Sequence, residues 1–253
     1  MASYPAPINY FQEVAEGNVI GHTAFTRVGF NPVISSTLQL IGGVNAVTPF
    51  MPSVAINIEA ISASSVDTST GTGVSLILVT GLDSGFNEIS EIITLGGTAA
   101  VISSNKFIRV YEATSIGCGT YRGANTGDIT VRGSSGGTSF LLIGAGQGMA
   151  LTSHYCVPAD KTMFVRDFFV AIEGNKNVSI SVFLGAGADV VTAPFVPMLV
   201  AARNGGLSQA FEITFSGVTG AIPEKTDFWV NGQAAAGTTA AVTVAYSSIL
   251  KSN

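Results

Sequence analysis

The sequence has little charge, two cysteines, two histidines, one tryptophan and no long uninterrupted apolar segment. Its 253 residues include 11 Lys and Arg against 16 Asp and Glu, which gives a formal net charge of -5. The positive residues are spread along the chain without a run, whereas a phosphate backbone is bound by clustered cations. We therefore expect no nucleic-acid partner.

The most apolar stretch runs from Val190 to Ala202 and contains two prolines. A membrane-spanning helix needs about 18 to 20 apolar residues, so we expect no membrane span. The N-terminal segment "MASYPAPINYFQ" has neither the basic nor the apolar region of a secretion signal. Mean hydropathy is nevertheless +0.47. We expect contacts between subunits to cover this apolar surplus, and enrichment in Ala and Gly is the alternative explanation.

The two cysteines, Cys118 and Cys156, allow one disulfide and no disulfide framework. We expect two buried free thiols in a protein made in a reducing cytoplasm. His154 and Cys156 alternate in one strand-like run, so together they could supply two zinc ligands. Because His22 and Cys118 lie far away without paired spacing, we expect no zinc site and burial of His154 in a core.

What the sequence does contain is a succession of short β-rich runs separated by turn residues. In the first half these are Ser53 to Ser62, Val74 to Leu82, Lys106 to Ala113 and Asp128 to Gly133; in the second half they are "MALTSHYCV", "TMFVRDFFVAIE", "NVSISVFLG", "QAFEITF", "DFWVNG" and "AAVTVAYSSIL". Turn signals recur about every 8 to 12 residues, which is typical of sandwiches and barrels.

The fold class predicted from this pattern is all-β, with two antiparallel β-sandwich, jelly-roll-like modules and an extended N-terminal arm. Glycine crowds residues 133 to 150, which suggests a boundary there. We expect the arm over residues 1–52, one sandwich over 53–145 and a jelly-roll-like sandwich over 146–253.

One short helix is expected near the start of the chain. Asn9 can cap it, Gln12 stands at the capping-box position, and Gly17 ends it after "YFQEVAE". Residues 198–203 are a second helix candidate, but "NGG" follows closely, so we prefer a strand that enters a hairpin.

Three acidic residues, Asp83, Glu88 and Glu91, gather in "GLDSGFNEISEIITLGG". An EF-hand loop beginning at Asp83 would place Glu88 where the invariant glycine belongs, so that motif fails. Paired catalytic carboxylates are the alternative reading. The composition of "DSGFN" between two β-rich runs favours a hairpin loop, with Glu88 beginning a strand and facing solvent.

The glycine-rich motifs also favour turns over chemistry. "GSSGG" at 133–137 matches the G-x-S-x-G pattern of serine hydrolases, but a strand-like run follows, and no acid lies between it and His154. "GAGQG" and "GAGAD" do not open a helix, so neither is a phosphate loop. We expect no catalytic residue, cofactor or metal. The rival hypothesis is an enzyme acting on host polysaccharide, which needs an acid pair in a groove.

Several motifs together resemble a family of small virion structural proteins of tailed bacteriophages, common in marine and cyanobacterial phages. They are "EVAEGNVIGHTAFTRVGFNP", "GLDSGFNEISEIITLGGTAAV", "FIRVYEA", "GANTGDITVRG", "VPADKTMFVRDFFVAIE" and "IPEKTDFWVNG". The resemblance extends from about Phe11 to Ile249. It implies a non-enzymatic virion component, assembled in the host cytoplasm, and it carries no catalytic residues.

The function expected is therefore capsid decoration, in which the protein acts as a cement that stabilises a phage head. The alternatives are a tail- or neck-attached fibre or adaptor protein and a host-glycan-binding adhesin. We expect a homo-oligomer, with a trimer favoured, bound to the major capsid protein or to tail components. Aromatic residues and prolines favour an ordered contact, so the partner-binding residues expected in the arm are Tyr4, Pro5, Pro7, Ile8, Tyr10 and Phe11.

Overall fold

Two layered β-modules make up the chain in a computed structural model. It describes residues 10–45, 47–120, 123–173, 176–185, 196–202, 209–214 and 221–253, with the backbone alone for 196–202 and 209–214. The elements are α1 (Tyr10–Ala15), β1 (His22–Ile34), β2 (Gln39–Leu40), β3 (Ile56–Ser62), β4 (Val74–Leu82), β5 (Glu88–Thr94), β6 (Val101–Phe107), β7 (Arg109–Cys118), β8 (Ile129–Gly133), β9 (Ser139–Ile143), β10 (Tyr155–Cys156), β11 (Lys161–Ile172), β12 (Val178–Gly185), β13 (Val196–Ala202), β14 (Gln209–Thr214), β15 (Asp227–Ala234) and β16 (Ala240–Ser252). The predicted all-β fold with antiparallel sandwich layers is confirmed.

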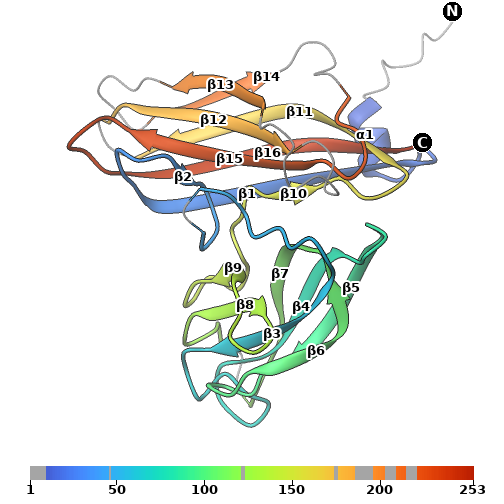
Figure 1. Ribbon diagram of the computed structural model, residues 1–253, viewed down its shortest axis with the longest axis vertical. Coiled ribbons are helices and arrows are strands. Elements are labelled where there is room, and N and C mark those ends of the chain that lie inside the picture. The colour runs from blue at the N-terminus through green and yellow to red at the C-terminus, as the bar shows by residue number, and fades with distance from the viewer. Residues whose placement is uncertain are drawn as a thin grey trace, which may run out of the picture.

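The larger module is a jelly roll built from two sheets. One sheet has the order β1-β16-β11-β14, and the other has the order β10-β15-β12-β13 with β2 also paired to β15. Figure 1 shows these sheets stacked as the upper part of the molecule. In β16, buried and intermediate residues alternate, as expected for a strand with one face toward the core. This strand order is that of a double-sheet jelly roll.

One edge position of the jelly roll is shared by two short strands. β2 pairs with β15 through Leu40 and Asn231, and β10 pairs with the same strand through Tyr155 and Phe228. Between β2 and β10 the chain builds β3 to β9. The smaller module is therefore an insertion that leaves the jelly roll at β2 and returns to it at β10.

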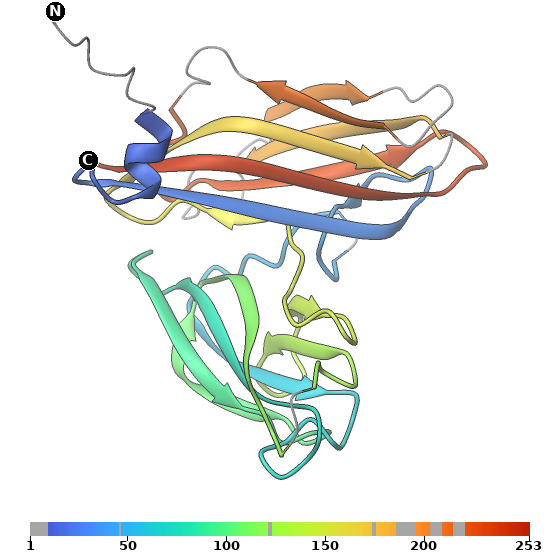
Figure 2. The same cartoon turned by 180° about the vertical axis from the view of Figure 1, so that it is seen from behind.

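The inserted module is a second, smaller sandwich. A four-stranded sheet with the order β6-β3-β8-β9 packs against a three-stranded sheet with the order β5-β4-β7. It hangs below the jelly roll in Figure 1, and Figure 2 shows the same arrangement from behind. Its strands share no sheet with those of the jelly roll, so the insertion occupies the place of the predicted 53–145 module. The predicted domain bounds, 53–145, remain a prediction.

The prediction that residues 1–52 form an extended arm is wrong for residues 22–40. β1 pairs with β16 from His22↔Lys251 to Ile34↔Ala240, so it is the first strand of the jelly roll. The sequence pattern concealed this strand because its partner lies at the opposite end of the chain. The jelly roll is thus discontinuous, and it includes β1 and β2 in addition to residues of the predicted 146–253 module.

Two predictions about individual secondary-structure elements are confirmed. α1 forms at the predicted place and buries Val14, and Gly17 follows it with a φ of 79°, the left-handed conformation that ends many helices. The cap residue Asn9 lies outside the described residues. Val196–Ala202 is a strand, as preferred over a helix.

Candidate functional site

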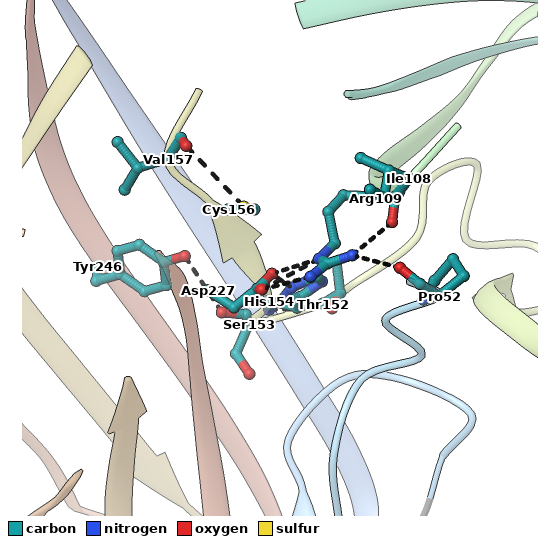
Figure 3. Close-up of polar contacts among 10 residues, drawn as sticks. All are labelled: Pro52, Ile108, Arg109, Thr152, Ser153, His154, Cys156, Val157, Asp227 and Tyr246. Carbon is teal, nitrogen blue, oxygen red and sulfur yellow. Dashed lines mark hydrogen bonds and ion pairs between the residues drawn. The ribbon is translucent and has the colours of Figure 1, made fainter. Parts of the chain in front are cut away.

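The junction between the two modules holds a buried cluster of charged side chains, shown in Figure 3. Arg109, the first residue of β7 in the insertion, donates from Nε to Asp227 Oδ1 at 2.9 Å and from Nη2 to Oδ2 at 2.9 Å. His154 Nε2 lies 2.9 Å from Asp227 Oδ1. The three side chains are 2–3% exposed. We call Arg109, His154 and Asp227 the junction clamp.

The clamp holds the insertion at both segments that connect it to the jelly roll, the outgoing one before β3 and the returning one before β10. Asp227 begins β15, and His154 directly precedes β10, the strand on which the chain returns to the jelly roll. The remaining guanidinium nitrogen of Arg109, Nη1, donates to the carbonyl oxygens of Pro52 and Ile108. Pro52 precedes β3 on the outgoing connection. One arginine therefore contacts the outgoing chain, the insertion and the jelly roll.

The clamp aspartate is ionised at neutral pH despite its burial. Desolvation alone would raise the pKa of Asp227, but the hydrogen bond and charge of His154 and the charge and hydrogen bonds of Arg109 outweigh it, so the pKa is lowered. An aspartate bonded to a histidine also occurs in acid–base sites. Here neither side chain is open to a substrate, so the arrangement acts as a structural ion pair.

An apolar contact accompanies the clamp. The loop between β4 and β5 carries Phe86, which is 1% exposed and belongs to the jelly-roll core cluster. Its carbonyl oxygen accepts a hydrogen bond from the Ala159 amide at 2.8 Å, and the guanidinium of Arg109 lies 5.7 Å from its ring centroid. Nearby, the ring centroids of Tyr111 in the insertion and Tyr155 in the jelly roll are 4.7 Å apart. The hairpin loop therefore docks the insertion onto the jelly roll.

The acidic cluster of the sequence belongs to this hairpin, as predicted. β4 and β5 pair antiparallel up to Leu82↔Glu88. Asp83 Oδ1 accepts from the amides of Gly85 and Asn87; burial would raise the pKa of Asp83, but these bonds and the Asn87 side chain lower it. The side chain thus fixes the loop that presents Phe86.

The other two acids make separate contacts. Glu88 is exposed at the start of β5, as expected, and its Oε2 accepts from the Tyr111 hydroxyl at 2.7 Å. Glu91 accepts from the backbone amides of Ser104 and Asn105. Each carboxylate has its own structural partner, so the three do not converge on one point.

The cysteine predictions are confirmed in part. Both thiols are free, but Cys118 is exposed and only Cys156 is buried; the expectation of two buried thiols is wrong for Cys118, which lies at the end of edge strand β7. His154 is buried, as expected, and both it and Cys156 interact with Asp227. Burial chiefly, and then the Asp227 charge, raises the pKa of the Cys156 thiol. Within the described residues, no three His, Cys, Asp or Glu side chains are grouped to hold a metal ion.

Two of the three glycine-rich motifs lie in described residues, and both form turns. "GSSGG" connects β8 to β9, and Glu59 accepts from the amides of Ser135 and Gly136 in that loop. In "GAGQG" the Gly146 amide donates to the Asn125 carbonyl oxygen. "GAGAD" falls outside the described residues after Gly185. Among the helices described, none is long and apolar enough to cross a membrane.

The predicted arm residues are divided between two parts of the chain. Tyr4, Pro5, Pro7 and Ile8 lie outside the described residues. Tyr10 and Phe11 belong to α1 rather than to an extended segment. The ring centroids of Tyr10 and His22 are 6.0 Å apart, and the Arg166 guanidinium lies 4.3 Å from the Phe11 ring centroid. Both side chains therefore contact the jelly roll of their own chain. Tyr10 remains 51% exposed.

The clamp was missed by reasoning from the sequence. The available signal was a charged residue within an apolar strand-like run of a charge-poor chain: Arg109 in "FIRVYEA" and Asp227 in "TDFWVNG". Such residues are almost never fully buried unless paired. Nothing local shows that these two pair with each other.

No protein-family model matches the sequence, and a search of curated proteins found no match. Among solved structures, the chain is similar to the VP2 subviral particle of infectious bursal disease virus, with 11% identity, a TM-score of 0.26, and coverage of 98% of this chain and 78% of that chain. A structure of the Gx strain of that virus is 9% identical, with a TM-score of 0.24 and coverage of 92% of this chain and 71% of that chain. Likeness at this level carries no argument about function.

Proposed function

We propose that the protein is a non-enzymatic virion structural protein that acts as a capsid decoration or cement protein. The observation that carries the proposal is the junction clamp, because it uses buried charges to hold two sandwiches in one fixed orientation. A protein that fastens other subunits needs such a rigid body. The sequence resemblance to virion proteins of tailed phages supports the same role.

Other charged residues of this charge-poor chain also stabilise its own loops. Asp67 is fully buried, and its carboxylate accepts from the Ser62 hydroxyl and from the amides of Val74, Thr126 and Gly127. Glu59 pairs with Arg132 at 2.7 Å. These bonds hold loops and strands of the insertion in place, which suits a component that fastens other subunits.

Exposed apolar side chains offer contact points for partners. Ile20, between α1 and β1, is 96% exposed, and Tyr10 lies close to the same end of the jelly roll. The chain before Tyr10 contains the remaining arm residues. We propose that Tyr4, Pro5, Pro7 and Ile8, together with exposed Tyr10 and Ile20, contact a sister subunit or the major capsid protein, and that the assembly is a trimer.

The direct test counts copies of the protein in purified virions by quantitative mass spectrometry. Hundreds of copies per particle are expected for capsid decoration. Six to eighteen copies, on the order of the ring symmetries of tails and necks, would instead indicate the tail- or neck-attached adaptor. Absence from purified particles would overturn the virion role altogether.

A truncation tests the arm. A variant lacking residues 1–8 keeps Asn9, the expected cap of α1, as well as α1 and both modules, so it is expected to melt at the wild-type temperature yet to decorate particles at lower occupancy. The matched control is Asn18→Ala, which alters an exposed residue of the loop after α1. Wild-type occupancy of the truncated protein would show that the arm is not the fastener.

A further inference from the structure

A cleft of about 680 Å³ opens between the insertion and the jelly roll. Its jelly-roll wall includes Thr23, Phe25 and Arg27 of β1, and its insertion wall includes Glu88 of β5 and Glu112 of β7. This volume lies within the ~300 to 1,000 Å³ typical of small-molecule sites. Because the clamp fixes both walls, the cleft is preformed.

One pair of opposite charges in the cleft is satisfied internally, and the other charged residues of the lining are Glu88, Asp160 and Lys161. Arg27 pairs with Glu112 at 2.8 Å, and its guanidinium lies 4.9 Å from the Tyr111 ring centroid and 5.3 Å from that of Tyr155. Glu88 accepts from the Tyr111 hydroxyl. Besides that ion pair, a ligand therefore meets carboxylates from both walls and the Lys161 ammonium as charged hydrogen-bonding groups.

Hydrogen-bonding capacity is left over on both walls. The Arg27 bonds among the described residues use Nη1 and leave Nη2 as a donor. Glu88 uses Oε2 and leaves Oε1 as an acceptor. The half-buried ring of Phe25, which packs at a tilt on the buried Tyr155 ring with centroids 4.6 Å apart, adds an apolar surface to the cleft. The site thus offers a donor, an acceptor and an apolar face in one cleft.

We propose that this cleft binds a neutral carbohydrate of one or two sugar units. A sugar hydroxyl can accept from Arg27 and donate to Glu88 at once, while the C–H face of the ring packs on Phe25. A lysine-rich peptide would place several positive charges beside Arg27 and Lys161, and the described residues offer no grouped ligands for a metal ion. The proposal is independent of the virion role, and it gives the glycan-binding alternative a definite place.

The test uses ligand-observed NMR with the intact protein and the methyl glycosides of glucose, galactose, mannose and N-acetylglucosamine as probes. A hexapeptide rich in lysine is the competing probe. Saturation transfer to at least one glycoside, and none to the peptide, is expected. Transfer to the peptide alone, or to no glycoside, would overturn the proposal.

Variants then locate the binding. Thr23→Trp places a large ring in the cleft and should abolish the signal. Thr26→Trp is the matched control, because Thr26 is exposed on the same strand and its side chain points to the opposite face. Glu88→Gln keeps an acceptor for Tyr111 but removes the charge, and should weaken binding at least about threefold, since charge-assisted bonds are roughly twice as strong as neutral ones. Equal binding by the wild type and Thr23→Trp would place the ligand elsewhere and refute the site.

Discussion

The inserted module keeps one apolar core to itself, whereas the jelly roll shares its core with the insertion. The core cluster of the insertion includes Ile58, Ile77 and Val131, and all its members lie between Phe50 and Ala150. The jelly-roll cluster, in contrast, includes four residues of the insertion: Leu82, Phe86, Ile108 and Tyr111. The jelly roll therefore needs the insertion to complete its core, whereas the core of the insertion contains no jelly-roll residue.

The charges at the junction follow the same asymmetry. Two clamp residues, His154 and Asp227, belong to the jelly-roll side, and Arg109 comes from the insertion. A buried ion pair adds little net stability when intact, but loss of one partner leaves the other charged and desolvated. We therefore expect variants at the junction to destabilise the jelly roll and not the insertion alone.

The largest effect is expected for Asp227→Ala, which leaves the Arg109 guanidinium buried without its carboxylate. The free energy of unfolding, measured by urea denaturation, should fall by about 3–5 kcal/mol. The double variant Arg109→Met with Asp227→Leu removes both charges and should recover most of that loss. A loss below about 1 kcal/mol for Asp227→Ala would show that the clamp does not hold the junction.

A pair of phenylalanine variants separates the two cores. Phe86→Ala and Phe140→Ala should each cost about 3 kcal/mol, because both rings are buried. Hydrogen exchange should show faster exchange of β11 and β15 in Phe86→Ala, although Phe86 belongs to the insertion. In Phe140→Ala the faster exchange should stay within β3 to β9. The same exchange pattern in both variants would contradict the shared-core arrangement.

Acid should weaken the junction through Asp227. Its pKa is lowered in the folded protein, so its contribution to stability is complete above its unfolded pKa of about 3.9 and is lost as pH falls through the lower folded value. Asp67 and Asp83, whose pKa values are also lowered, add to this loss. The free energy of unfolding should thus decline below about pH 4, with a shallower decline in Asp227→Ala. Equal slopes would assign the acid sensitivity to the other carboxylates.

The smallest effects are expected among the hairpin acids. Asp83→Ala removes the acceptor that fixes the Phe86 loop and should cost about 1 kcal/mol, more than the limit of about 0.5 kcal/mol expected for a surface residue. Glu88→Gln keeps the bond to Tyr111 and should stay within that limit. Thermal denaturation of the two variants side by side measures the difference, and a smaller loss for Asp83→Ala would reverse the assignment.

The sequence predicted those features that depend on neighbouring residues. The β4–β5 hairpin, the short helix before Gly17 and the turn at "GSSGG" follow from turn chemistry and alternation. The pairing of β1 with β16 depends on two segments at opposite ends of the chain, so the insertion into a jelly roll could not be read locally. The same holds for Arg109 and Asp227, whose burial is decided by tertiary contact alone.

The most direct test of the central claim, that the clamp and the shared core make one unit of two sandwiches, is differential scanning calorimetry of the full chain. We expect a single transition with equal calorimetric and van't Hoff enthalpies, which splits into two transitions in Asp227→Ala. Two resolved transitions in the wild-type protein would contradict the claim, because they would show that the jelly roll and the insertion unfold independently.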